Sequence, residues 1–197
     1  MMVLLDENFW SERYKLGLTG WDIGCPSIPL VQYLDQIENK SIRVLIPGAG
    51  NAYEADYALR AGFTNVNVLD VSAEPLERFR LKHPDFPKDN LHHQDFFNHS
   101  FTYDLILEQT FFCALAPGLR EKYSQKMLEL LNPGGKLVGV LFNRTFDFQG
   151  PPFGGKKEEY LTYFTGKFEV ETFEPCYNSI PQRSGSEFFI KLKKSEA

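Results

Sequence analysis

A glycine turn followed by a distant carboxylate is the feature of this sequence best suited to chemistry. Gly48 and Gly50 follow the apolar run 44–46 and Pro47. Glycine at such a place lets the backbone approach a ligand that a Cβ would hold away. Asp70 ends the next apolar run, 22 positions beyond Gly48, and a carboxylate near that spacing can accept both hydroxyls of a ribose. The pattern predicts a nucleotide-type cofactor site, against the alternative that Asp70 caps the helix beginning near Ser72.

The glycine spacing also limits which cofactor the turn can hold. Enzymes that bind dinucleotides use a third glycine, three positions after the second, where a helix packs beneath a pyrophosphate. In this chain the third position is Tyr53. A bulky side chain there argues against a pyrophosphate and favours a cofactor that places only a small polar tail at the turn. S-adenosylmethionine has such a tail in its amino-acid end, and we expect it to be the cofactor.

Two further groups of residues are candidates for the rest of the cofactor. Asp95 is expected to accept from the exocyclic amine of adenine, while the backbone N–H of Phe96 serves a ring nitrogen. The alternative for Asp95 is a polar turn residue. Trp10, Tyr14 and Trp21 would offer aromatic faces to a sulfonium cation, or they pack as part of the core. The sequence favours neither interpretation of these three aromatic residues.

The sequence indicates neither a metal site nor a pair of nucleophile and base. His83, His92, His93 and His99 have no mutual metal-ligand spacing and no CxxC companions. Cys113 has no clear histidine partner and is interpreted as a small buried hydrophobic residue. We therefore assign no metal and no catalytic base.

The elements that must position these residues alternate between strands and helices along the chain. Helices are expected at 6–16, 29–38, 52–61, 73–82, 118–131 and 156–164, and strands at 42–46, 65–70, 90–93, 103–107, 135–142, 167–174 and 185–193. The Asn-Pro-Gly-Gly run 132–135 predicts a helix stop and a turn. This rhythm predicts an α/β protein: a Rossmann-like, doubly wound, mostly parallel seven-stranded sheet, with the last two strands as an antiparallel pair at one edge. Such sheets bind ligands at the carboxyl ends of their strands.

Length, charge and cysteine content describe the class of protein. The chain has 197 residues, which suits a single domain, 1–197, with residues 1–40 as an N-terminal helical lid over the cofactor site. A net charge of −5 without a basic stripe disfavours nucleic acid as a partner. Neither a membrane span nor a signal peptide is indicated. Three well-separated cysteines suggest free thiols in a reducing cytoplasm. With S-adenosylmethionine as the expected cofactor, the expected partner is a small-molecule methyl acceptor, and we expect a monomer.

Several short blocks resemble one family of enzymes. The Thr-Phe-Phe-Cys-Ala run 110–114 and the Gly-Pro-Pro-Phe run 150–153 are the most specific blocks. Further blocks are Thr19–Gly24, Val44–Gly50, Leu69–Ser72 and Gln94–Phe97. From Trp10 to about Phe189, the chain resembles the thiopurine S-methyltransferase family and its halide/thiol methyltransferase branch, among the class I S-adenosylmethionine-dependent methyltransferases. The resemblance implies a cofactor site formed by Trp10, Tyr14, Trp21, Gly48, Asp70, Asp95 and Phe96. We expect Gly50 and Gln109 to bind the cofactor as well.

The chain departs from that family pattern at three aromatic positions. Gln109 stands where halide/thiol relatives carry a tyrosine, and Phe142 stands where some of them carry another. Tyr14 replaces a tryptophan and keeps an aromatic face. Gln109 and Phe142 lie near the expected acceptor site. The family resemblance therefore predicts use of the cofactor, but it does not identify the acceptor.

The resemblance implies methyl transfer to a small, soft nucleophile. The cofactor carries the intrinsic reactivity of such an in-line displacement, so a thiol, a thiopurine-like thiol or a halide needs little or no general base. The expected acceptor cup is rich in phenylalanine and is formed by Trp21, Phe111, Phe112, Phe142 and Phe153. Arg144 would attract an anionic acceptor or lower the pKa of a thiol, or it is a solvated surface arginine.

Two other functions stay open from the sequence. A small NAD(P)-dependent reductase would share the glycine turn, although the missing third glycine counts against it. A non-catalytic module that binds S-adenosylmethionine or adenosine is compatible with the altered acceptor positions, Gln109 and Phe142.

Overall fold

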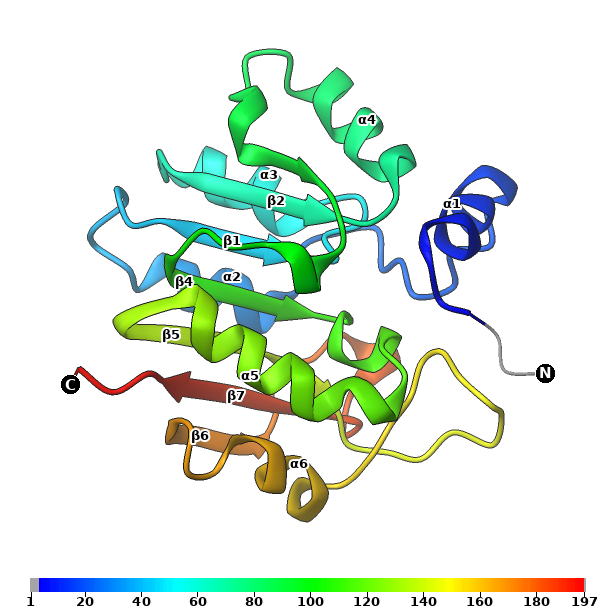
Figure 1. Ribbon diagram of the computed structural model, residues 1–197, viewed down its shortest axis with the longest axis vertical. Coiled ribbons are helices and arrows are strands. Elements are labelled where there is room, and N and C mark those ends of the chain that lie inside the picture. The colour runs from blue at the N-terminus through cyan, green and yellow to red at the C-terminus, as the bar shows by residue number, and fades with distance from the viewer. Residues whose placement is uncertain (1–3, 197) are drawn as a thin grey trace.

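The computed structural model describes residues 4–196. Residues 1–3 and 197 lie outside the described residues. They include the start of the expected lid and part of the N-terminal segment that was predicted not to be a signal peptide. The chain forms one seven-stranded sheet in the order β3-β2-β1-β4-β5-β7-β6 (Figure 1). The strands are Val44–Pro47 (β1), Val66–Asp70 (β2), Leu91–His93 (β3), Tyr103–Gln109 (β4), Leu131–Phe142 (β5), Glu169–Pro175 (β6) and Glu187–Lys193 (β7). The α-helices are Glu7–Leu16 (α1), Ile28–Asp35 (α2), Tyr53–Arg60 (α3), Ala73–Lys82 (α4), Arg120–Leu130 (α5) and Lys157–Phe164 (α6).

The predicted doubly wound arrangement is confirmed. Strands β1 to β5 pair in parallel, and β7 is antiparallel to both β5 and β6. The strand order reverses direction at β1, from which β2 and β4 extend to opposite sides. The carboxyl ends of β1, β2 and β4 therefore meet at the switch point, where open α/β sheets bind ligands.

The run 132–135 differs from its prediction. It lies within β5 instead of forming a separate turn between a helix and a strand, because α5 ends at Leu130 and β5 starts at the next residue. Pairing with β4 is irregular there: Tyr103 is opposite Leu131, and the next pair is Leu105 with Lys136. Gly134 has φ +75°, and a glycine takes such a backbone conformation without steric cost. The Asn-Pro-Gly-Gly run is thus accommodated as an irregular stretch in an extended strand.

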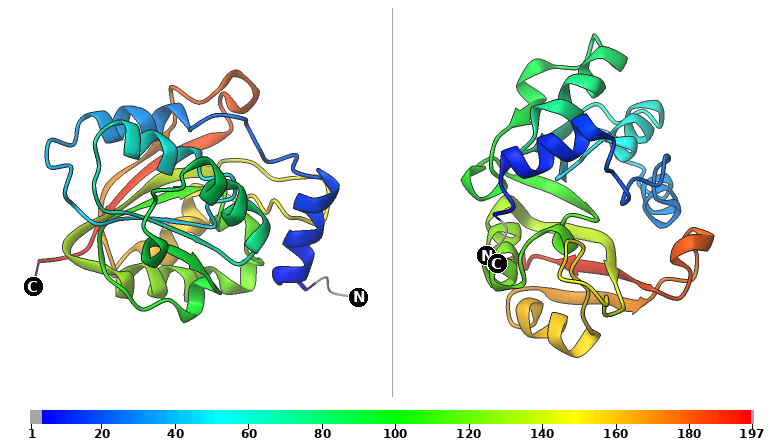
Figure 2. Two further views of the ribbon diagram at one scale, coloured as in Figure 1. Left: turned by 90° about the horizontal axis from the view of Figure 1, so that it is seen from above. Right: turned by 90° about the vertical axis from the view of Figure 1, so that its right-hand side faces the viewer.

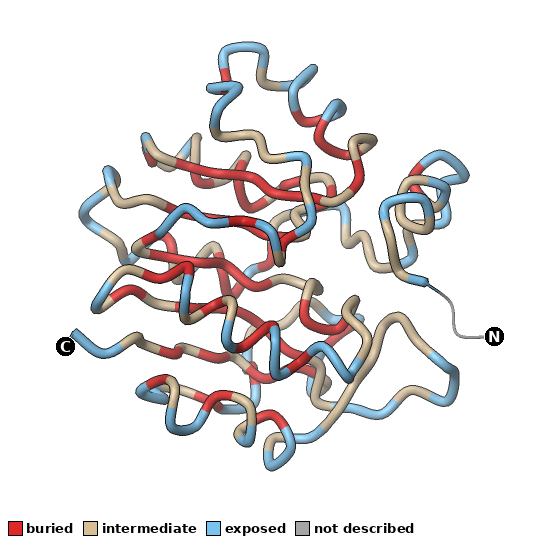
Figure 3. The backbone as a smooth tube through the Cα atoms, in the orientation of Figure 1, coloured by how far each residue is buried: buried red, intermediate tan, exposed pale blue. Residues whose placement is uncertain are grey.

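Two apolar clusters hold the helices against the two faces of the sheet. Neighbouring strand residues point to opposite faces, so Leu45 belongs to the cluster beneath α5 and α6, while Val44 and Ile46 belong to the cluster beneath α2, α3 and α4. Figure 3 shows that the central strands β1, β2 and β4 are buried almost throughout, whereas the edge strands β3 and β6 are mostly not. Among the described residues, no helix combines the length and apolar character that crossing a bilayer requires.

Helix α1 stands apart from these layers, at the carboxyl ends of the parallel strands (Figure 2). Its Ser11 hydroxyl lies 2.8 Å from that of Ser72, and Arg78 of α4 donates to the backbone oxygen of Tyr14 at 2.9 Å. These bonds place the apolar side of α1 toward the strand ends, where the site residues gather.

Candidate functional site

One large cavity lies at the carboxyl ends of the parallel strands. Its volume is about 1100 Å³, which is slightly above the range of about 300–1,000 Å³ for pockets that enclose a drug-sized ligand. Helix α1, the glycine turn, the ends of β2, β4 and β5, and the loops after β5 and before β7 contribute to its wall. Ten residues proposed from the sequence line it: Trp10, Tyr14, Trp21, Gly48, Asp70, Asp95, Phe96, Phe111, Phe142 and Arg144.

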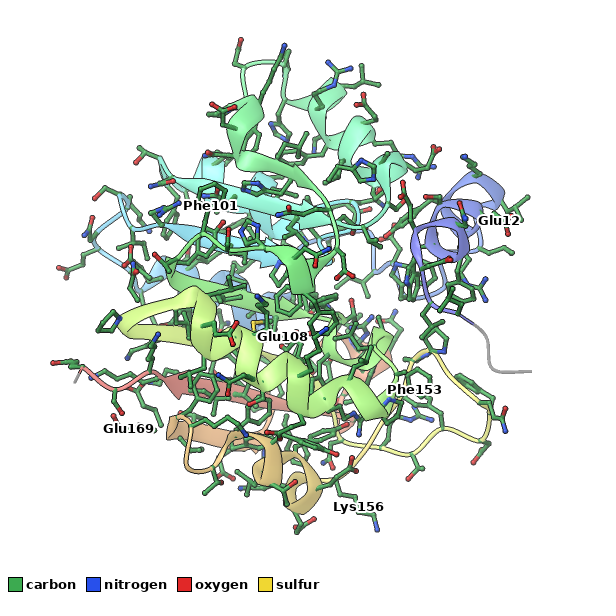
Figure 4. The ribbon with its side chains drawn as sticks, in the orientation of Figure 1. Glu12, Phe101, Glu108, Phe153, Lys156 and Glu169 are labelled. Atoms are coloured by element: carbon green, nitrogen blue, oxygen red, sulfur yellow. The ribbon has the colours of Figure 1, made fainter. Side chains whose placement is uncertain are left out.

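Four other candidates from the sequence are not in the cavity wall. Gly50 lies in the turn just behind it, and Gln109 has a buried side-chain oxygen without a hydrogen-bond partner among the described residues. Phe112 is 1% exposed and belongs to the core beneath α5 and α6. Phe153 lies on the loop after β5 (Figure 4), and its neighbouring prolines, residues 151–152, line the cavity instead. Of the four phenylalanines predicted for the acceptor cup, Phe111 and Phe142 line the cavity, and Phe146 and Phe148, which the sequence did not single out, line it as well.

The glycine turn and Asp70 form one hydrogen-bonded unit. The buried carboxylate of Asp70 accepts from the backbone N–H of Gly50 at 2.9 Å and from that of Ser72 at 2.8 Å. Burial raises the pKa of Asp70, and these amides act in the opposite direction. Gly48 has φ +57°, and a Cβ there would run into the ring of Phe111. Asp70 therefore stabilises the glycine turn through its hydrogen bond with Gly50. This structural role is additional to the ribose contact that the sequence spacing predicts.

Three aromatic residues of the N-terminal segment pack edge to face at the cavity. The ring centre of Trp21 is 5.4 Å from that of Trp10 and 5.7 Å from that of Tyr14. Tyr14 is buried, and its hydroxyl oxygen is 2.8 Å from where a Cβ on Gly50 would lie. The side chains that the sequence left undecided thus pack on one another and also line the cavity.

Asp95 and Phe96 lie at the end of the cavity beyond β3. The Asp95 carboxylate accepts from the backbone N–H of Phe97 at 2.8 Å, so it makes the turn contact that the alternative interpretation predicts. It also lines the cavity. The Phe96 ring is buried and packs edge to face on Phe111, at 5.0 Å between centres.

A buried carboxylate that sequence reasoning missed shapes the turn after β4. Glu108 is fully buried at the centre of the molecule (Figure 4). One of its carboxylate oxygens accepts from the backbone N–H groups of Phe111 and Phe112, at 2.8 and 2.9 Å, and the other accepts from the Tyr123 hydroxyl at 2.5 Å. Burial raises the pKa of Glu108 to about 7. Thr110, between these groups, has φ +58°, which is uncommon for a residue other than glycine.

The part of the cavity beyond Phe111 combines aromatic rings with arginines. Arg144 lines it, with its guanidinium 4.9 Å from the ring centre of Phe146. Arg183, which the sequence did not single out, also lines the cavity and stands 5.3 Å from the ring centre of Phe142. It donates to the backbone oxygen of Trp21 at 2.8 Å. Arg183 therefore links the N-terminal segment to the loop before β7, a contact without a local sequence signal.

Groups for proton transfer or metal binding are few at this cavity. None of its described lining residues is a histidine. Burial and the nearby charge of Glu108 raise the pKa of Cys113, which favours its neutral thiol. Among residues 4–196, no group of three or more His, Cys, Asp or Glu side chains is placed to hold a metal ion.

The residues present fit S-adenosylmethionine. A buried carboxylate for the ribose, a glycine turn with room for a small tail, and aromatic faces for a sulfonium share one cavity. Tyr53 stands at the position where a third glycine would admit a pyrophosphate, and its hydroxyl is 3.3 Å from the Asp22 carboxylate. Fold and cavity together define the Rossmann-like methyltransferase architecture. The 1,6-didemethyltoxoflavin-N1-methyltransferase of Burkholderia thailandensis shares this fold, with a TM-score of 0.73 and 15% identity, covering 96% of this chain and 87% of that one.

Sequence comparison identifies the family. The model of the thiopurine S-methyltransferase (TPMT) family matches residues 5–189, so the chain belongs to that family. It is an S-adenosylmethionine-dependent methyltransferase. It is 34% identical to the probable thiol methyltransferase 2 of Arabidopsis thaliana, covering 98% of this chain and 88% of the relative. It is 29% identical to the thiocyanate methyltransferase 1 of Brassica oleracea, covering 96% of this chain and 86% of the relative.

Proposed function

We propose that the chain methylates a small, soft nucleophile, a thiol or a halide-like anion, at the end of the cavity beyond Phe111. The observation that carries this proposal is the single cavity that joins the glycine turn and Asp70 to a region of aromatic rings and Arg144. The names of two relatives, a thiol and a thiocyanate methyltransferase, support the same acceptor class.

In this proposal each side chain around the cofactor has a distinct role. Asp70 accepts from the ribose hydroxyls, Asp95 and the Phe96 backbone bind adenine, and Gly48 lets the backbone approach the tail. Trp10, Tyr14 and Trp21 present aromatic faces to the sulfonium, an attraction of the kind that aromatic rings exert on ammonium ligands. Gly50 acts through its hydrogen bond to Asp70, and we assign no ligand contact to Gln109.

The protein's contribution to the reaction is alignment and exclusion of water. S-adenosylmethionine supplies, when bound, an activated methyl group whose transfer needs no acid or base. Phe111, Phe142 and the prolines at 151–152 would desolvate the nucleophile and hold it in line, and positioning of this kind can contribute several kcal/mol. Arg144 would draw an anionic acceptor toward the cavity.

We also propose that the single domain, 1–197, works as a cytoplasmic monomer. Of the described part of the lid expected at residues 1–40, only the stretch up to Ile23, which includes α1, lines the cavity and can act as a lid, because α2 packs in the core against the sheet. Helix α1 is held by its two hydrogen bonds to Ser72 and α4 and by two ion pairs, Lys15 with Glu74 and Glu7 with His93. Exposed ion pairs contribute little to stability, which supports a lid that can move. Cys25, Cys113 and Cys176 are free thiols, which suits a reducing compartment.

Ligand binding followed by product detection tests the proposed function. S-adenosylmethionine and S-adenosylhomocysteine should raise the melting temperature, whereas NAD(H) should not. Methylated products should then form from thiocyanate, iodide, bisulfide or an aromatic thiol. Cofactor binding without turnover on all four acceptors would instead favour a binding module.

The pH dependence should differ between acceptors because the cavity offers no histidine base. The rate with an aromatic thiol is expected to rise with pH until the thiol is ionised in solution, since the thiolate is the nucleophile. The rate with thiocyanate, which is an anion throughout, should stay nearly flat over the same interval. A bell-shaped thiocyanate profile would point to an essential acid and base in the enzyme and contradict this mechanism.

Gly48→Ala should weaken cofactor binding by about tenfold or more. A left-handed backbone costs a non-glycine residue about 1–2 kcal/mol, and the new Cβ would also displace Phe111. Gly62→Ala is a matched control, because Gly62 has φ +90° with open space around it and does not line the cavity. By isothermal titration with S-adenosylhomocysteine, the Gly62→Ala protein should keep its affinity; equal affinity in both variants would remove Gly48 from the site.

A further inference from the structure

Asp22 is a cavity residue for which the sequence pattern predicted no individual role. It lies in the segment that connects α1 to α2, directly after Trp21, and it lines the cavity. Its carboxylate accepts from the side-chain amide of Asn51 at 2.6 Å and from the Tyr53 hydroxyl at 3.3 Å. Asn51 immediately follows Gly50, so these bonds hold the Asp22 carboxylate beside the glycine turn.

The backbone around Asp22 is held on both sides. The backbone N–H of Gly24 donates to the other carboxylate oxygen of Asp22 at 2.7 Å, and Arg183 donates to the backbone oxygen of Trp21 at 2.8 Å. Each carboxylate oxygen has two lone pairs, so these bonds orient the carboxylate and leave it able to accept from a ligand.

Two carboxylates, Asp22 and Asp70, stand at the glycine turn, while the nearby cation Arg78 donates to the backbone oxygen of Tyr14. Burial, with the nearby charges of Asp70 and Asp22, raises the pKa of Tyr14, whose hydroxyl lies beside Gly50. Neither Asp22 nor Asp70 takes part in an ion pair formed within residues 4–196. Such a place suits the cationic end of a ligand better than an anionic one.

We propose that Asp22 binds the α-ammonium group of the amino-acid tail of the cofactor, an inference that rests on the proposed function. The tail is expected at the glycine turn. Asp70 is reserved for the ribose, and Asp95 lies on the far side, after β3. Asp22 is the carboxylate beside the turn that remains. Asn51 and Tyr53 are positioning residues, because they orient Asp22 without contacting the ligand themselves.

A cycle of two proteins and two ligands tests this assignment. The ligands are S-adenosylhomocysteine and its deaminated analogue, which keeps the nucleoside, the thioether and the carboxylate. The proteins are the wild type and Asp22→Asn, whose amide can still accept from Gly24. Hydrogen bonds to charged groups contribute about 1.5–3 kcal/mol, so the wild type should bind S-adenosylhomocysteine about 10- to 100-fold more tightly than the analogue. The Asp22→Asn protein should bind the two ligands with nearly equal affinity.

The controls separate this contact from a structural role and from the proposed function itself. Asp70→Asn should lower the affinity for both ligands by the same factor, because both contain the ribose. A wild type that binds both ligands equally overturns the role of Asp22 without any variant. A preference that persists in Asp22→Asn, or an equal loss for both ligands, also overturns it. A wild type that binds neither ligand refutes the cofactor site as a whole.

Discussion

Replacing Asp70 with alanine is expected to lower the affinity for S-adenosylmethionine by at least about 100-fold. Two hydrogen bonds from ribose hydroxyls to a carboxylate contribute about 1.5–3 kcal/mol each, and each 1.4 kcal/mol is a factor of about ten in affinity. The same substitution removes the acceptor of the Gly50 N–H, so the glycine turn also loses its anchor. Both effects weaken binding at one end of the cavity.

Isothermal titration with S-adenosylhomocysteine measures this loss, and circular dichroism checks that the variant is folded. Asp85→Ala is a suitable control because this carboxylate is exposed and does not line the cavity. Asp70→Asn keeps acceptors for the turn while removing the charge, so it should bind more tightly than Asp70→Ala. Unchanged affinity in a folded Asp70→Ala protein would remove Asp70 from the site and with it the ribose assignment.

Replacing Glu108 with alanine is expected to lower the free energy of unfolding by about 3–5 kcal/mol. The change leaves a cavity and three buried donors, at Phe111, Phe112 and Tyr123, without their acceptor. Glu108→Gln is the matched control. Its carbonyl oxygen can accept from both backbone N–H groups while its amide donates to the Tyr123 oxygen. Chemical denaturation should therefore show a much smaller loss for glutamine than for alanine.

The pH dependence of stability gives a second measurement on Glu108. Its pKa is raised by burial from 4.5 to about 7, so the folded protein keeps a proton that the unfolded chain has released. The contribution of Glu108 to stability is full below pH 4.5 and is lost as pH rises to about 7. The slope approaches about 1.4 kcal/mol per pH unit.

Glu108→Gln should not lose stability in this way, because glutamine does not titrate. Between pH 4.5 and about 7, the unfolding free energy of the Glu108→Gln protein should therefore rise relative to that of the wild type. Comparing the two proteins at each pH cancels the titration of other groups. A difference that stays constant with pH would show that Glu108 has an ordinary pKa in the folded protein.

The turn after β4, which Glu108 holds in place, also contributes to the cofactor site. Phe111, on this turn, packs on Phe96 and occupies the space beside Gly48. Glu108→Gln should accordingly preserve cofactor affinity along with the turn, and Glu108→Ala should weaken it.

Much of the fold and of the cofactor end of the site follows from local sequence patterns. The apolar runs at β1 and β2 and the glycines between them appear in a short stretch of chain, and the spacing to Asp70 comes from the length of one βαβ unit. The helical pattern of the N-terminal segment did not decide whether Trp10, Tyr14 and Trp21 face the cofactor or the core. The family resemblance placed them at the cofactor.

The other residues escaped prediction because their roles depend on partners distant in sequence. Glu108 lies near the end of β4 and accepts from two nearby backbone N–H groups, but its third partner, Tyr123, comes from α5, 15 positions further along the chain. Arg183 meets Trp21 across 162 positions, and no local pattern reports such a contact. Phe112 and Phe153 looked like cup residues because they belong to aromatic blocks, but composition does not state which way a side chain points.

By itself, the sequence predicted a doubly wound α/β fold with a nucleotide-type cofactor site at the glycine turn and Asp70, because strand periodicity, glycine turns and βαβ spacing are local properties. The resemblance of short motifs to one family added the methyltransferase activity. Only the tertiary structure decided which rings form the cavity wall, that Glu108 holds the turn after β4, and that Asp22 stands beside the glycine turn. These outcomes depend on how the N-terminal segment and the loops after β4 and β5 pack together, and such packing is a property of the folded chain as a whole.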